Sequence, residues 1–163
     1  MSRFDRQIRR LVPSLAKLSY NPIFKVIVNA GSSIGNLLFP EYQRLPPTHL
    51  RVRVGVANRL FFNQSLYIEL GERFWINQLL SGDCDLESSI VEVGCGCGRM
   101  ARPIYESSNF RGAYTGIDID DEMLHWCREN LKKPNFQFLR STNLSHTYSK
   151  GSINEGERVN NSI

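Results

Sequence analysis

No apolar run in this 163-residue sequence approaches the roughly 20 residues that a membrane-spanning helix needs. The nearest candidate, residues 23–39, is interrupted by lysine, asparagine, serine and glycine, which excludes a plain span. It also starts too late, behind too long a basic leader, to be a secretory signal. With 41% hydrophobic and 22% charged residues, the composition is that of one soluble globular domain with a single core.

Cysteine is scarce, with four residues at positions 84, 95, 97 and 127. Their spacing is not that of a zinc site, and Cys95 and Cys97 alternate with glycines in a turn where two thiols could not comfortably share a metal. We therefore predict no metal site, reduced thiols that pack as small apolar side chains, and a cytoplasmic location.

The chain also lacks a generally basic surface. Residues 1–50 carry seven Lys/Arg and two Asp/Glu, whereas residues 51–163 carry thirteen and fourteen. The positive excess is confined to the N-terminal third, so the sequence gives no strong signal for nucleic-acid binding.

That N-terminal arm begins with Phe4, Ile8, Leu11 and Val12 at helical spacing, with arginines between them. The pattern is typical of a short amphipathic helix that makes weak contact with an anionic membrane. The interpretation that we favour is a helical extension that packs on the domain or is loosely tethered to it.

The most informative stretch is residues 90–99, an apolar run with one carboxylate that breaks into three alternating glycines. It predicts a buried strand, a tight turn and a helix that continues to about Glu106. Gly94, Gly96 and Gly98 then form the floor of a site where a ligand touches bare main chain. The alternative is an ordinary glycine-containing turn.

A second strand is predicted from Tyr114 and ends in Asp118, which lies 20 residues after Gly98. A Rossmann-like unit places at this distance the acid that accepts hydrogen bonds from ribose hydroxyls. Strand, glycine turn, helix, strand and acid thus follow one another in a consistent order.

Two details bear on the cofactor. The dinucleotide fingerprint Gly-x-Gly-x-x-Gly would need a glycine at Arg99, so a nicotinamide or flavin cofactor is disfavoured. Glu92 lies inside the apolar strand, where a negative charge is costly without a donor or a cation. A positively charged ligand would account for it.

The sequence Val-Glu-Val-Gly-Cys-Gly-Cys-Gly-Arg at 91–99, with Gly-Ile-Asp-Ile-Asp at 116–120, resembles the first two motifs of the Rossmann-like (class I) S-adenosylmethionine-dependent methyltransferases. The resemblance spans roughly residues 50 to 145. It implies S-adenosylmethionine as cofactor, with Glu92 at its methionine end, the glycines beneath it, Asp118 on the ribose and Ile119 against the adenine.

Many relatives place an acid after the third strand to meet the adenine amino group, and here residues 141–143 are Ser-Thr-Asn. Asn143 is therefore the candidate for this contact, with Thr142 as the alternative. No catalytic base and no metal ligand is assigned. The candidate cofactor-binding residues are Glu92, Gly94, Cys95, Gly96, Gly98, Asp118, Ile119 and Asn143.

The remaining elements follow from local signals. A helix from Gln64 to Leu80 is predicted to bury Tyr67, Leu70, Phe74, Ile76, Leu79 and Leu80 under the first strand, with Trp75 also in the core. Pro46-Pro47 marks a junction, and residues 51–55 form a short alternating segment. Asp120 caps a helix that Pro134 stops, and a third strand covers residues 136–139.

We expect an α/β fold with a Rossmann-like parallel sheet that ends after its third strand. The predicted organisation is a basic helical arm (1–50), the N-terminal half of a methyltransferase domain (51–143) and a polar, disordered tail (144–163). Such a half-sheet exposes an apolar edge and predicts self-association. The alternatives to a methyltransferase are a non-catalytic remnant or cofactor-binding module and, less favoured, a nicotinamide-dependent oxidoreductase.

Overall fold

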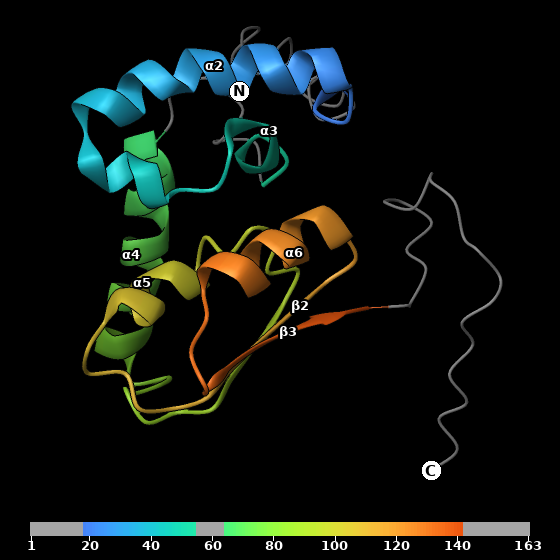
Figure 1. Ribbon diagram of the computed structural model, residues 1–163. Coiled ribbons are helices and arrows are strands. Elements are labelled where there is room, and N and C mark those ends of the chain that lie inside the picture. The colour runs from blue at the N-terminus through green and yellow to red at the C-terminus, as the bar shows by residue number, and fades with distance from the viewer. Residues whose placement is uncertain (1–17, 55–63, 142–163) are drawn as a thin grey trace, which may run out of the picture.

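The computed structural model describes residues 18–54 and 64–141 (Figure 1). The predicted α/β architecture is confirmed: within these ranges the chain forms a parallel three-stranded sheet flanked by helices. Three predictions lie outside the described residues, namely the helix around Phe4, Asn143 and the tail 144–163. The elements are α2 (Pro22–Leu38), the 3-10 helix η1 (Pro40–Arg44), α3 (Thr48–Arg51), α4 (Gln64–Ser81), β1 (Ile90–Val93), α5 (Ala101–Glu106), β2 (Tyr114–Asp118), α6 (Asp121–Asn130) and β3 (Phe136–Arg140).

The sheet has the order β1-β2-β3, and both pairings are parallel. Ile90 pairs with Tyr114, which in turn pairs with Phe136, so the three strands start in register. α5 connects β1 to β2, and α6 connects β2 to β3. The carboxyl ends of β1 and β2 therefore meet at one edge of the sheet, which is where parallel α/β sheets carry their ligands.

Only one face of the sheet is covered by the described helices (Figure 1). On that face Tyr114 and Phe138 pack with Leu124 and Cys127 of α6 and with Trp75 of α4 in a single buried cluster. This clustering follows from strand alternation, since every second side chain points to the helices.

On the opposite face, Val91 and Val93 are 65% and 82% exposed, so β1 is not the buried strand that its apolar run predicted. Both belong to β1, which is an edge strand among the described residues. The predicted self-association through this edge stays a prediction.

Helix α4 was predicted, but its buried face differs from the expected one. The residues that it buries are Gln64, Tyr67, Gly71 and Trp75, a stripe with a spacing of three to four residues. Four residues that were expected in the core are exposed instead, namely Phe74, Ile76, Leu79 and Leu80. The reason lies at Gly71, where a Cβ would be 2.4 Å from the carbonyl oxygen of Arg99, so α4 approaches the turn after β1 backbone to backbone.

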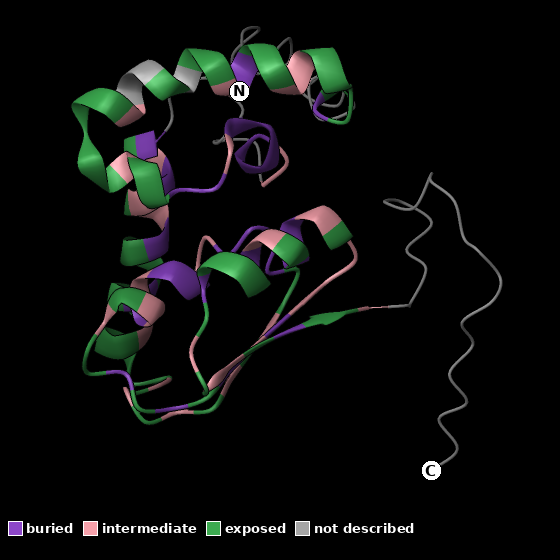
Figure 2. Ribbon diagram, in the orientation of Figure 1, coloured by how far each residue is buried: buried purple, intermediate pink, exposed green. Residues whose placement is uncertain are grey.

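The alternating segment after the proline junction is not extended. α3 ends at Arg51, and the chain continues in turns, in which Arg53 N donates to Leu50 O at 3.0 Å and Val54 N to Arg51 O at 3.1 Å. Every residue of α3 is buried, as Figure 2 shows, because this short helix lies between α2 and the rest of the domain.

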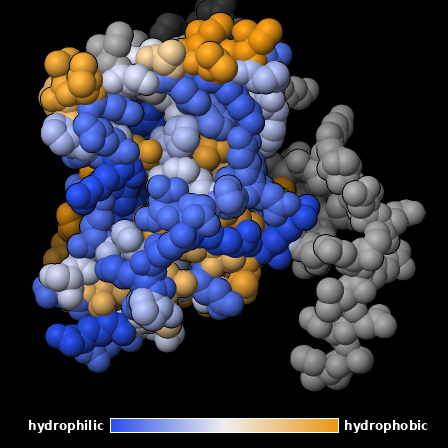
Figure 3. Space-filling view, in the orientation of Figure 1, coloured by the Kyte–Doolittle hydropathy of each residue, from blue (hydrophilic) through white to orange (hydrophobic). Residues whose placement is uncertain are grey.

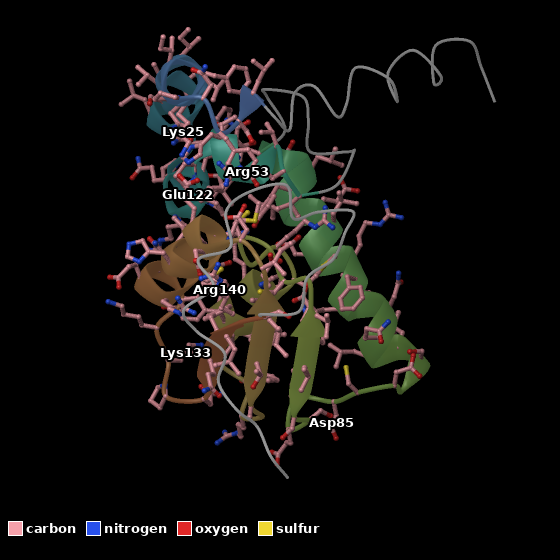
Figure 4. All side chains as sticks on the ribbon, turned by 90° about the vertical axis from the view of Figure 1, so that its right-hand side faces the viewer. Lys25, Arg53, Asp85, Glu122, Lys133 and Arg140 are labelled. Atoms are coloured by element: carbon pink, nitrogen blue, oxygen red, sulfur yellow. The ribbon has the colours of Figure 1, made fainter. Side chains whose placement is uncertain are left out.

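An ionic cluster joins these N-terminal elements to α6 (Figure 4). The carboxylate of Glu122 accepts from Lys25 Nζ at 2.6 Å, from Arg53 Nη2 at 2.8 Å and from His49 Nε2 at 3.0 Å. Arg53 also donates from Nη1 to Asp120 at 3.0 Å. Residues separated by about 70 to 100 positions are thereby held together, and we call this group the Glu122 cluster.

The Glu122 cluster predicts a pH dependence of stability. Partial burial favours the protonated carboxyl, but the hydrogen bonds from Lys25, Arg53 and His49 outweigh it and lower the pKa of Glu122 from 4.5 to about 2. Burial also lowers the pKa of His49, so the ring is neutral at pH 7 and donates from Nε2. A carboxylate with a depressed pKa stabilises the fold above pH 4.5 and loses that contribution as pH falls toward 2.

Thermal melts of the wild type and of Glu122→Gln at pH 7, 5 and 3 test this. We expect the variant to have a lower melting temperature than the wild type at pH 7. The difference between the two melting temperatures is expected to narrow between pH 5 and pH 3. A gap that stays constant across this range would show that ionisation of Glu122 is not what holds α2 and α3 to α6.

Candidate functional site

The turn after β1 requires glycine at three positions. Gly94, Gly96 and Gly98 have φ angles of 81°, 54° and 76°, in the left-handed region where a side chain is unfavourable. The turn thus reverses the chain from β1 to α5 within seven residues.

The three glycines have different surroundings. Gly94 is exposed, and a Cβ there would meet nothing within 4 Å. At Gly96 a Cβ would lie 3.1 Å from Val54 Cγ2, and at Gly98 it would lie 2.7 Å from Leu131 Cδ1. Only Gly94 therefore offers open space in its Cβ direction, whereas Gly96 and Gly98 also serve close packing. Cofactor contact at these glycines stays a prediction.

Asp118 lies beside this turn, as the spacing predicted. Its Oδ2 accepts from Gly96 N at 2.6 Å, and its Oδ1 accepts from Ile119 N at 2.7 Å and from Asp120 N at 2.9 Å. The carboxylate is partly buried. It therefore ties the end of β2 to the glycine turn after β1.

Glu92 points to the helix-covered face of the sheet. The Oε2 of Glu92 accepts a hydrogen bond from the hydroxyl of Tyr114. Glu92 pairs with Gly116 on β2, and because glycine has no side chain, nothing at this position separates the Glu92 carboxylate from the Tyr114 hydroxyl. Burial raises the pKa of Glu92, although the Tyr114 hydrogen bond and the charge of Arg99 favour its ionised form. A cationic ligand nearby would favour ionisation further.

The other predicted cofactor residues in the described region, Cys95 and Ile119, differ in burial. Cys95 is buried, and its thiol packs beneath Gly116, so only its main chain can reach a ligand at the turn. Burial raises the pKa of Cys95, as it does for Cys97, whose pKa is about 12, and for Cys127. These thiols are protonated at neutral pH and unsuited to nucleophilic work. Ile119 is partly buried at the end of β2.

Sequence reasoning missed two residues that shape the turn. Tyr67 of α4 is fully buried, and its hydroxyl donates to Cys97 O at 2.9 Å. Val54 packs over Gly96, and its carbonyl oxygen lies 3.5 Å from Arg99 Nη1. Neither contact carries a local signal, because each joins the turn to a segment 30 or more positions away.

A groove of about 520 Å³ lies between α6 and β3, lined by Leu131, Lys133, Phe136 and Phe138 among others. It contains none of Glu92, Gly94 or Asp118. The groove is thus separate from the glycine turn, and its lining offers no acid, base or nucleophile in a geometry that suggests chemistry.

The segment that contains the glycine turn is similar to a known protein family. Residues 90–154 match a family whose model is described as a methyltransferase domain. The match starts at the first residue of β1 and includes the glycine turn, Asp118 and Asn143. No solved structure matches the chain.

Proposed function

We propose that the segment that matches a methyltransferase-domain family model, residues 90–154, binds S-adenosylmethionine as the class I methyltransferases do and serves methyl transfer to an acceptor. The observation that carries the proposal is the 2.6 Å contact between Asp118 and the main chain of Gly96. It joins the candidate ribose acid to the glycine turn at the carboxyl edge of β1 and β2.

The hydrogen bonds that Asp118 already accepts limit how many more it can accept from a ligand. A carboxylate has about four lone-pair positions, and three N–H groups already occupy positions on Asp118. We infer that one position, on Oδ2, remains for a ribose hydroxyl. A contact to both hydroxyls would require Gly96 N to release its bond.

Glu92 and Gly94 would serve the other end of the cofactor. S-adenosylmethionine, when bound, supplies a methyl group made electrophilic by the positive sulfonium. A partly buried carboxylate such as Glu92 is suited to oppose a positive charge on the methionine portion, and the open space at Gly94 lets a ligand approach the main chain. The residues of this chain would bind and orient the methyl donor, and no general base is assigned.

Two other functions compete. A non-catalytic module that keeps a cofactor site would use the same residues without transferring a methyl group. A nicotinamide-dependent oxidoreductase is disfavoured, because Arg99 stands where the dinucleotide fingerprint has its last glycine, and because Glu92 would repel a pyrophosphate.

Titration calorimetry of the full chain with S-adenosylmethionine, S-adenosylhomocysteine and NAD separates these functions. Binding of the first two ligands together with methyl transfer to an acceptor supports a methyltransferase. Binding without transfer supports the module, and binding of NAD alone would overturn the proposal.

Asp118→Ala is expected to weaken S-adenosylmethionine binding by about tenfold to a hundredfold, since a hydrogen bond to a charged group contributes roughly 1.5 to 3 kcal/mol. The matched control is Asp121→Ala, because Asp121 is exposed and pairs with exposed Arg140 at 2.8 Å. Calorimetry of both variants, with circular dichroism to check the fold, gives the comparison. Equal affinities for wild type and Asp118→Ala would mean that the ribose is held elsewhere.

A further inference from the structure

The outward face of α2 is apolar towards both ends of the helix. Ile23, Val26, Ile27, Leu37 and Leu38 are all exposed. Figure 3 shows the corresponding hydrophobic patches along the top of the molecule, where α2 lies. Apolar side chains gathered in this way on one surface helix mark an interaction site.

The inward face of α2 fixes this orientation. Lys25 donates to Glu122 at 2.6 Å, and Asn29 Nδ2 lies 3.0 Å from His49 Nδ1 while its Oδ1 accepts from His49 N. Val28, between them, is buried. Rotating α2 to bury Ile23 and Ile27 would break these polar contacts, so the helix presents these apolar side chains outward, opposite to an ordinary surface helix.

Charge distinguishes between the surfaces that could cover this face. Lys25 is the one charged residue in the sequence of α2, and it points inward. The 17 residues that precede the described region carry five Lys/Arg and one Asp, whereas the rest of the chain carries fifteen of each sign. The whole net charge of +4 thus belongs to the segment that precedes the apolar helix in the sequence.

We propose that α2 docks in the plane of an anionic lipid bilayer with its apolar side chains in the interface, and that the positive charge of the segment before it in the sequence attracts the anionic headgroups. An apolar helix face together with a basic cluster supplies the two signals that stable peripheral binding needs. None of the described helices is long and apolar enough to cross a bilayer.

A second copy of the chain fits this face less well. A two-fold dimer places the same patch of each subunit against the other. Two copies would bring two positively charged segments into one complex, where like charges repel, whereas an anionic bilayer attracts both. The proposal is independent of methyl transfer.

Co-sedimentation of the full chain with vesicles tests the proposal. We expect binding to phosphatidylcholine vesicles that contain phosphatidylserine, weaker binding to phosphatidylcholine alone, and a further decrease at high salt. The double variant Ile27→Glu/Leu37→Glu is expected to bind at least about tenfold more weakly, since two apolar anchors are replaced by charges that the anionic surface repels.

Leu80→Glu is the matched control, because Leu80 at the end of α4 is 82% exposed and Leu37 is 81% exposed. Full binding by this variant, with melting temperatures of all proteins unchanged, supports the proposal. Failure of the wild type to sediment with the anionic vesicles overturns it, as does an equal loss in Leu80→Glu. A dimer that the double variant dissociates, without vesicle binding, would identify a second copy as the occupant.

Discussion

Arg53→Ala is expected to lower the free energy of unfolding by about 3 to 5 kcal/mol, the usual cost of removing one partner from a buried ion pair. The side chain of Arg53 is only 4% exposed and contacts Asp120 and Glu122 at 3.0 and 2.8 Å. It also donates to Ser19 and lies 3.8 Å from the centre of the Tyr20 ring. Its removal leaves the mostly buried carboxylate of Asp120 without this cation, leaves Glu122 with Lys25 and His49 alone, and removes the hydrogen bonds to Ser19 before α2.

Urea unfolding followed by far-UV circular dichroism measures this loss. Arg73→Ala is the control, since Arg73 pairs with Glu69 on the surface of α4 at 3.3 Å and both side chains are more than half exposed. Exposed pairs of this kind contribute about 0.3 to 0.5 kcal/mol. Similar losses in the two variants would mean that the Glu122 cluster is no more than a surface network.

The elements that the sequence predicted well have strong local signals. β1 is an apolar run, and its end is marked by glycines that the observed positive φ angles require. α6 begins where Asp120 was expected to cap it, and Asp120 Oδ1 accepts from the main chain of Glu122 and Met123. Each of these signals is contained within a few neighbouring residues, so no knowledge of the rest of the fold was needed.

The missed features depend on contacts between distant segments. Apolar residues occur on more than one side of α4, so the pattern alone could not select Tyr67, Gly71 and Trp75 as the buried stripe. That choice is made by the turn after β1, where Trp75 Nε1 donates to Met100 O at 2.5 Å.

In the candidate site, too, the sequence predicted what has a local signal and missed what depends on contacts between distant segments. The 20-residue interval placed Asp118 near the glycine turn, because a strand, a turn and a helix of standard length span a fixed distance. The interval carries no information on how many main-chain groups Asp118 would bind. The hydrogen bond from Tyr114 to Glu92 was equally hidden, because it depends on the register of β1 and β2. The assigned cofactor contacts, the domain boundaries and the cytoplasmic location stay predictions.

Gly112→Ala adds one methyl group and is expected to lower the free energy of unfolding by about 2 to 4 kcal/mol. This loss is at or above the upper end of what overpacking usually costs. A Cβ at this residue would lie 2.0 Å from the carbonyl oxygen of Ser88. The two loops cannot separate freely, because Gly112 N donates to Leu86 O at 3.1 Å and Asn135 Nδ2 donates to Gly112 O at 2.6 Å. Relief of the clash would disturb the start of the β1–β2 pairing.

Gly31→Ala adds the same methyl group with the opposite expected result. A Cβ at Gly31 would meet nothing within 4 Å, and the residue lies inside α2, where alanine is favoured over glycine by roughly 0.5 to 1 kcal/mol. We therefore expect the urea midpoint to rise in Gly31→Ala and to fall in Gly112→Ala. Because the two variants reduce the freedom of the unfolded chain alike, a difference in sign reports on the folded state. A rise in both variants would show that the loop carrying Ser88 yields to the methyl group, and that the start of the sheet is less constrained than its hydrogen bonds indicate.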